Sequence, residues 1–214
     1  MFGLVAAATL VHAQGFVIVQ STAASITTNT GTWGNTTQLN PAYTTLTGGK
    51  TTTTAGQFDY ALLFSTTSIS DGPTDAGWTQ ATQNGGAALG LANYLVAGGI
   101  TGPGGSGGAA LNMAAGTTYF VQLVGWSASL GSTWSTVESQ LASGTWNPNG
   151  GFFGETAVST VTPFSVAGTD PTIFPGTWVN GSLTMFAVPV PEPTTLALAG
   201  LGGISMLFLR RRKS

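Results

Sequence analysis

The chain has 214 residues, of which 42% are hydrophobic and only 6% are charged, against about 25% in an average soluble protein. Because its hydrophobic fraction is sufficient for a packed core, the composition argues against a disordered chain. Residues 14–189 hold one Lys against six acidic residues, a formal charge of −5, which excludes the clustered basic surface that nucleic acid binding needs. The lack of Cys excludes disulfides, thiolate metal sites and a Cys nucleophile.

The first segment, residues 1–13, is apolar and built of small residues. Its run of about ten apolar residues is typical of a secretory signal peptide and is too short to span a bilayer, although no Lys or Arg precedes it. Val11, His12 and Ala13 satisfy the small-x-small rule of signal peptidase, which places the cut between Ala13 and Gln14. The segment therefore predicts export.

The following body, residues 14–187, reads as short strands separated by turns. The clearest strand is 117–126, where Tyr119 and Val121 fall on one side and Val124 and Trp126 on the other. Further strands are predicted at 15–20, 57–65, 155–161 and 182–188. Gly-rich turn signals between these segments favour antiparallel connections.

One helix is predicted at residues 132–144. Hydroxyl residues offer a cap, Trp134, Val137 and Leu141 recur at helical spacing, and Gly144 ends the pattern. The fold class that follows is all-β: an antiparallel β-sandwich or jelly roll with one short helix. A β-helix or solenoid is the alternative, although the sequence shows no fixed repeat.

Residues for catalysis are few. The one histidine, His12, lies in the predicted signal peptide, so the mature chain would hold neither His nor Cys and no Ser-His-Asp triad. No cofactor is expected. Asp59, Glu138 and Glu155 leave open a glycoside hydrolase or lyase that uses paired carboxylates.

Two other groups of residues have a structural and a functional interpretation. Asp71 and Asp75 supply candidate oxygen ligands for Ca²⁺, although capping of turns is the simpler interpretation. The six tryptophans either fill the core or, if exposed on one face, stack on sugars, and we favour the core.

The end of the chain combines three features. Pro191, Glu192 and Pro193 precede an uncharged run of 16 residues, 194–209. As a helix this run would be about 24 Å long, marginal for a hydrocarbon core of about 30 Å. The basic residues that follow would stay on the cytoplasmic side and so place the body outside the inner membrane. These residues are Arg210, Arg211, Arg212 and Lys213.

This combination resembles the PEP-CTERM sorting signal over about residues 188–214. The resemblance implies a substrate of an exosortase, a membrane-embedded cysteine transpeptidase of Gram-negative bacteria. It implies that Pro191, Glu192 and Pro193 form the recognition and processing motif. The simpler alternative is a permanent C-terminal anchor with the prolines as a spacer.

The sequence thus predicts an exported, non-enzymatic surface or extracellular-matrix protein, which is held transiently in the inner membrane and then released or transferred. A carbohydrate-binding or adhesive module, with extracellular polysaccharide as its partner, is the first alternative. The expected organisation is a signal peptide at 1–13, a β-rich extracytoplasmic domain at 14–187, a Pro-Glu-Pro linker at 188–193, a transmembrane helix at 194–209 and a basic cytoplasmic tail at 210–214.

Overall fold

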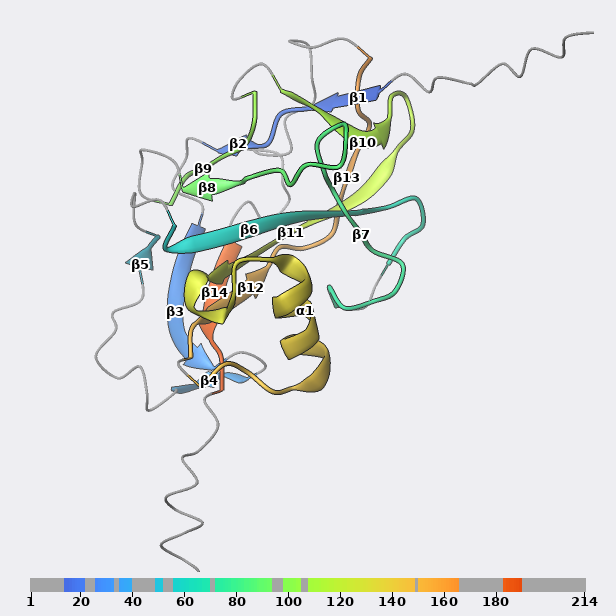
Figure 1. Cartoon of the computed structure of the whole chain (residues 1–214). Helices are drawn as coiled ribbons and strands as arrows, with labels where there is room; N and C mark the ends of the chain where they lie inside the picture. The colour runs from blue at the N-terminus through green and yellow to red at the C-terminus, as the bar shows by residue number, and fades with distance from the viewer. Residues whose placement is uncertain are drawn as a thin grey trace, which may run out of the picture.

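A computed structural model of the chain shows a body of β-strands with one α-helix among the residues that it describes (Figure 1). The described residues are 14–21, 26–32, 35–39, 49–51, 56–69, 72–93, 98–104, 108–148, 150–165 and 183–189. The predicted β-rich body with a short helix is confirmed within these ranges. The predicted transmembrane helix at 194–209 lies outside them.

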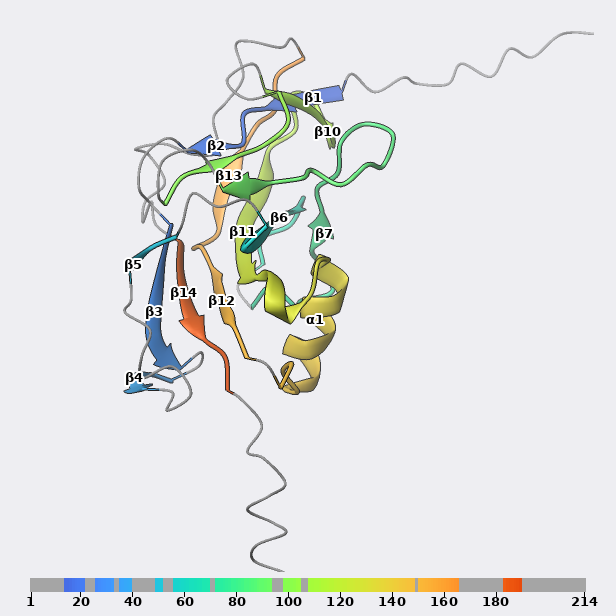
Figure 2. The same ribbon diagram turned by 60° about the vertical axis from the view of Figure 1, so that its left-hand side comes forward.

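The largest sheet contains nine strands in the described part of the chain. Its main path runs β4 (Asn35–Leu39), β3 (Ile26–Thr32), β14 (Leu183–Ala187), β12 (Phe152–Glu155), β11 (Tyr119–Ser127), β6 (Phe58–Ser65) and β7 (Thr79–Gln80). Two further strands pair with this path, β13 (Ser159–Val161) with β11 and β5 (Gly49–Lys50) with β3. Figure 2 shows β3, β14 and β12 side by side.

The prediction of a purely antiparallel fold is wrong at one pair of strands. β14 runs parallel to β3, with Leu183 opposite Ile26 and Phe186 opposite Asn29, whereas the other pairs of this sheet are antiparallel. A parallel pair needs a long connection between its strands. Here almost the whole body lies between β3 and β14 in the sequence, so the sheet is mixed.

Two small sheets pack on one face of the main sheet, and the helix packs on the other (Figures 1 and 2). One small sheet pairs β1 (Gln14–Val17) with β10 (Ala109–Ala114). The other has the order β2 (Gln20–Ser21), β9 (Ile100–Thr101) and β8 (Ala92–Asn93). Since both faces of the main sheet are covered, its central strands are buried on both sides.

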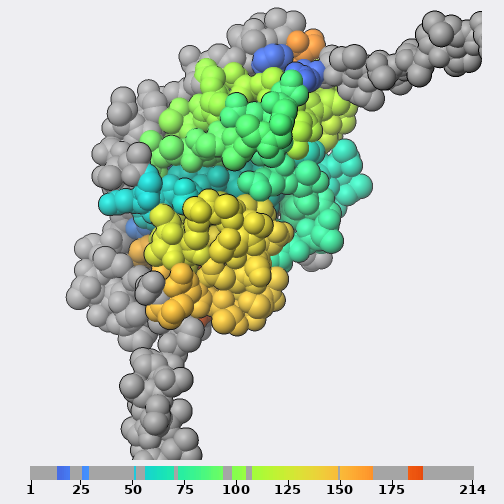
Figure 3. Space-filling model, in the orientation of Figure 1, coloured from blue at the N-terminus to red at the C-terminus, as the bar shows by residue number. Residues whose placement is uncertain are grey.

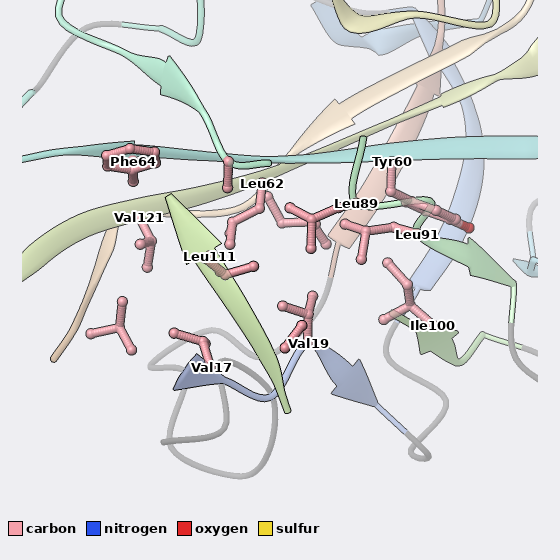
Figure 4. Packing of buried hydrophobic residues seen from close by; sticks show 14 of the residues in the cluster. Val17, Val19, Tyr60, Leu62, Phe64, Leu89, Leu91, Ile100, Leu111 and Val121 are labelled. Carbon is pink, nitrogen blue, oxygen red and sulfur yellow. The ribbon is translucent and has the colours of Figure 1, made fainter. Parts of the chain in front are cut away.

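The first core lies between the main sheet and the small sheets (Figure 4). Tyr60, Leu62 and Phe64 of β6 reach it, together with Val17 from β1 and Leu111 from β10. Alternate residues of β11, among them Tyr119, Val121 and Leu123, also belong to it. Burial of one such aliphatic side chain contributes about 1.5–3 kcal/mol, so this layer holds the small sheets in place.

The second core lies between the opposite face of the main sheet and helix α1 (Trp134–Ser143). Leu63 of β6 and Trp126 of β11 meet Trp134 and Val137 of the helix there, around the fully buried Phe153 of β12. Because β6 and β11 contribute to both cores, their sequences are almost continuously apolar. The predicted division of 117–126 into two sides is confirmed.

Helix α1 has the predicted cap and end. Thr133 is extended, and its Oγ1 accepts a hydrogen bond from the backbone N–H of Thr136 at 3.4 Å. Gly144 ends the helix at φ 66°, a left-handed conformation that glycine adopts without a steric penalty. The spacing of Trp134, Val137 and Leu141 therefore places all three against the second core.

The other predicted strands are found with shifted bounds. Segment 182–188 corresponds to β14, and segment 15–20 divides into β1 and β2. The prediction of a single strand at 155–161 is wrong, because β12 ends at Glu155 and β13 begins at Ser159. Thr156 interrupts the strand: its Oγ1 accepts from the backbone N–H of Leu123 at 3.0 Å, and its own N–H donates to the Leu123 carbonyl at 2.9 Å.

Candidate functional site

The C-terminal end of the folded body is well defined. Met185, Ala187 and Val188 are fully buried. The N–H of Val188 donates to the carbonyl oxygen of Gly151 at 2.9 Å. Pro189 is the first exposed residue after the strand and the last that the structure describes. The polypeptide therefore leaves the body directly from an interior strand of the main sheet.

A cleft of about 220 Å³ opens at the edge of β6. Its polar lining includes Asp59, Gln80, Ser132 and Thr133, which come from three separate segments of the chain. Figure 3 shows this side of the molecule, where the yellow surface of the α1 segment meets the cyan and green surfaces of β6 and the chain after it. Ser132 and Thr133 reach the cleft because the chain turns there into the helix.

The apolar wall of the cleft is formed in part by Trp126 and Trp134. The two side chains are only 2% and 5% exposed, and their ring centroids lie 5.9 Å apart. The indole N–H of Trp126 is already used, because it donates to the carbonyl oxygen of Gly131 at 2.7 Å. The cleft therefore offers several polar groups beside a small aromatic surface rather than an open ring face.

Charge in the cleft comes from one carboxylate among its lining residues. Asp59 stands opposite Trp126 in the β6–β11 pair, and burial raises the pKa of its carboxyl group. Glu138 and Glu155 do not line the cleft. The paired carboxylates of a glycoside hydrolase are therefore not brought together in this cleft.

A second polar cluster lies where β11 meets the end of β12. The Nε2 of Gln122 donates to the carbonyl oxygen of Thr156 at 2.9 Å and lies 3.4 Å from Oε2 of Glu155. The Oε1 of Gln122 is buried and has no hydrogen-bond partner among the described residues. Burial raises the pKa of Glu155 to about 7. The side chain of Gln122, with its buried acceptor, thus lies next to the carboxyl group of Glu155, which keeps its proton up to nearly neutral pH.

This cluster predicts a pH dependence of stability. Since the pKa of Glu155 is about 7 in the folded chain and 4.5 in its unperturbed state, folding favours the protonated carboxyl group. The contribution of Glu155 to stability is therefore fully present below about pH 4.5, is lost as the pH rises to about 7, and does not change further above that. One pKa unit corresponds to about 1.4 kcal/mol, and screening at this partly exposed group reduces the total loss to roughly 1–2 kcal/mol.

Denaturant unfolding at pH 5 and pH 7.5 measures this loss for the wild type and for Glu155→Gln. The variant should lose about 1–2 kcal/mol less than the wild type over the same interval. Equal losses in the two proteins would show that Glu155 is not the titrating group.

The other predicted site residues are distributed as follows. Asp75 caps a turn, with its Oδ1 accepting from the N–H of Gly77 at 2.8 Å, as the simpler interpretation predicts. Asp71 lies outside the described residues, as does Ala13, while Gln14 begins β1. The residues of the predicted sorting signal also lie outside: Pro191, Glu192, Pro193, Arg210, Arg211, Arg212 and Lys213. Within the described ranges, no group of three or more His, Asp or Glu residues is placed to hold a metal ion.

The tryptophans that the structure describes serve packing. Trp126, Trp134 and Trp146 are at most 5% exposed, and Trp78 is packed against the same second core. Trp146 and Trp134 both lie against Phe153, at centroid distances of 5.8 Å and 6.4 Å. The interpretation of these four as core residues is confirmed. Trp33 and Trp178 lie outside the described residues.

Sequence reasoning did not identify the cleft. The sequence indicates Asp59 only as a member of a carboxylate pair and the hydroxyl residues Ser132 and Thr133 only as helix caps, and it gives no signal for Gln80. They are far apart in the sequence and form a common surface only because the β6 edge, β7 and the helix start converge.

Among the described helices, none is long and apolar enough to cross a membrane.

Comparison with known proteins gives one finding. The PEP-CTERM protein-sorting motif matches residues 189–213. No curated protein and no solved structure matches the chain. The match begins at Pro189, the first exposed residue after the buried end of β14, so fold and motif adjoin without overlapping. The C-terminal segment of this chain is a PEP-CTERM protein-sorting motif.

Proposed function

We propose that this chain is an exported, non-enzymatic surface or extracellular-matrix protein that is delivered by its C-terminal motif. The observation that carries the proposal is the match of the PEP-CTERM protein-sorting motif to residues 189–213. A signal peptide at residues 1–13 directs export across the inner membrane. The uncharged run at 194–209 and the basic tail then hold the chain transiently in that membrane, with the body outside.

The proposed partner is an exosortase-like transpeptidase of the inner membrane, as the resemblance of this signal implies. Such an enzyme cuts the peptide near Pro191, Glu192 and Pro193. Its cysteine thiolate attacks the carbonyl carbon of the scissile bond, and the departing amine takes up a proton. An acceptor nucleophile or water then releases the new C-terminus from the enzyme. The body thereby reaches the cell surface or the extracellular space without the tail.

The experiment that tests this proposal replaces Glu192, the one charged residue of the peptide 189–193. Glu192→Gln keeps the size of the side chain but removes its charge, and we expect at least a tenfold loss of processed protein. The measurement is the ratio of cut to uncut chain in the membrane fraction, read by gel shift. Glu138→Gln is the matched control and should be processed like the wild type, because Glu138 lies on helix α1. Normal processing of Glu192→Gln would contradict the assigned role of Glu192.

The cleft supports a second candidate function, the binding of a small neutral ligand such as one terminal sugar unit. Gln80, Ser132 and Thr133 supply hydrogen-bonding groups around an apolar wall, and Asp59 disfavours anions. The volume of about 220 Å³ is below the 300–1,000 Å³ that is typical of sites for drug-sized ligands, so a single small unit fits best.

Binding of neutral oligosaccharides to the full chain, measured by calorimetry, tests this candidate. Gln80→Ala should weaken the binding about tenfold, since one lost hydrogen bond is worth about 1–1.5 kcal/mol. Gln57→Ala is the control, because Gln57 is exposed and does not line the cleft. An equal effect of the two substitutions would place the ligand elsewhere.

A further inference from the structure

The fold holds the polypeptide firmly up to the residue that precedes the sorting motif. β14 lies between β12 and β3, so both of its edges are paired. Leu183, Met185, Ala187 and Val188 are at most 1% exposed. The hydrogen bond from Val188 to Gly151 extends this anchoring one residue past the strand. Any cut in the folded protein must therefore lie beyond Val188.

The distance from this anchor to the processing peptide is short. Pro193 follows Val188 by five residues, and an extended chain spans at most about 3.6 Å per residue, or about 18 Å in total. The sequence also predicts a stiff tether, because proline restricts its own φ angle and favours an extended residue before it, and prolines stand at 189, 191 and 193. A folded domain cannot move far from an enzyme that holds a peptide on such a tether.

The surface around the anchor is formed in part by four residues of uncharged type. We call it the exit face and define it by Ser129, Asn147, Pro148 and Pro189. The Oγ of Ser129 donates to the carbonyl oxygen of Gly150 at 2.8 Å, and the Nδ2 of Asn147 donates to the carbonyl oxygen of Ser129 at 2.9 Å. Gly150 precedes Gly151, the partner of Val188, so these contacts connect the exit face directly to the anchor.

We propose that the short tether, residues 189–193, holds the exit face against the extracytoplasmic surface of the processing enzyme while the enzyme cuts the chain near Pro191, Glu192 and Pro193. This inference depends on the proposed function, because it assumes that such an enzyme acts on the motif. None of the four residues that define the exit face is charged. Attraction to anionic lipid headgroups relies on Lys and Arg, so the exit face suits a protein surface better than the bilayer.

The opposite end of the body provides an internal control. β1 and β10 lie at the end of the body opposite to the one where β14 ends (Figures 1 and 2). Ala114, the last residue of β10, pairs with Gln14, and Thr117 is exposed in the turn that follows. Thr117 therefore marks a surface that points away from the exit face.

The absence of cysteine from the chain allows a direct test by cross-linking. Two single-cysteine variants of the full chain, Pro148→Cys and Thr117→Cys, are labelled with a benzophenone maleimide. The labelled chains are then placed in membrane vesicles that contain a catalytically inactive form of the enzyme. On illumination, the label at position 148 should join the chain to the enzyme at least tenfold more often than the label at position 117. Ser129→Cys is a second position on the exit face, in case Pro148→Cys disturbs its turn.

Cross-links to lipid alone, or equal yields at the two ends, would overturn the proposal. A 12-residue Gly-Ser insertion between Val188 and Pro189 tests the tether itself, since such a linker adds roughly 20 Å of flexible reach. The cross-link at position 148 should fall at least fivefold in the inserted chain, and an unchanged yield would contradict the role of the tether. If active enzyme leaves the unlabelled chain uncut in the same vesicles, it is the proposed function that fails.

Discussion

Phe153→Ala should lower the free energy of unfolding by about 3–5 kcal/mol, the largest loss that we expect from a single truncation. Phe153 is fully buried in the second core and is flanked by the rings of Trp134 and Trp146. Its removal takes apolar surface out of the core and leaves a cavity between a strand and a helix that both remain anchored elsewhere. The measurement is denaturant unfolding of the purified body.

Phe164→Ala is the matched control for this substitution. The side chain of Phe164 is 47% exposed. The hydrogen bonds between Phe164 and Phe16 are made by backbone atoms, so the substitution leaves them in place. We expect a change within about 0.5 kcal/mol, as is usual at surface positions. Similar losses in both variants would mean that helix α1 does not pack on the main sheet as described.

Gly154→Ala should destabilise the chain by about 2–3 kcal/mol or more, although it adds only one methyl group. A Cβ at this position would overlap with the carbonyl oxygen of Thr184 and lie 2.8 Å from the Cα of Met185. Both are backbone atoms of β14, so relief requires the separation of β12 from β14. Since β14 carries the chain to the sorting motif, the same change loosens the anchor.

Gly72→Ala is the control for the added methyl group, because open space surrounds that position. Its stability should stay within about 0.5 kcal/mol of the wild type. Thermal unfolding followed by circular dichroism compares the two variants. A stable Gly154→Ala protein would contradict the close approach of β12 and β14.

The parts of the fold that sequence predicted are those with a local apolar pattern. β6, β11 and α1 place large side chains at regular spacing, so periodicity alone identified them. β3 is rich in Thr and β10 in Ala, and neither shows a strong alternation of apolar and polar residues. The parallel pairing of β3 with β14 depends on contacts between the two ends of the body, which local patterns do not encode.

The two candidate sites also differ in how far the sequence alone indicates them. The sorting motif is a linear signal, in which order and spacing carry the information, so Pro191, Glu192 and Pro193 were recognisable in the sequence. The cleft combines Asp59, Gln80 and the start of α1, and no one of these segments indicates it. The role of the tether also required the structure, because only the burial of Val188 shows where the fold ends.

The central claim is that the C-terminal motif directs processing of an exported body, and the intact mass of the extracellular protein tests it most directly. We predict a chain that begins at Gln14 and ends between Val188 and Pro193, without the uncharged run and the basic tail. An extracellular protein that still carries Arg210 to Lys213 would contradict the claim and would favour a permanent anchor.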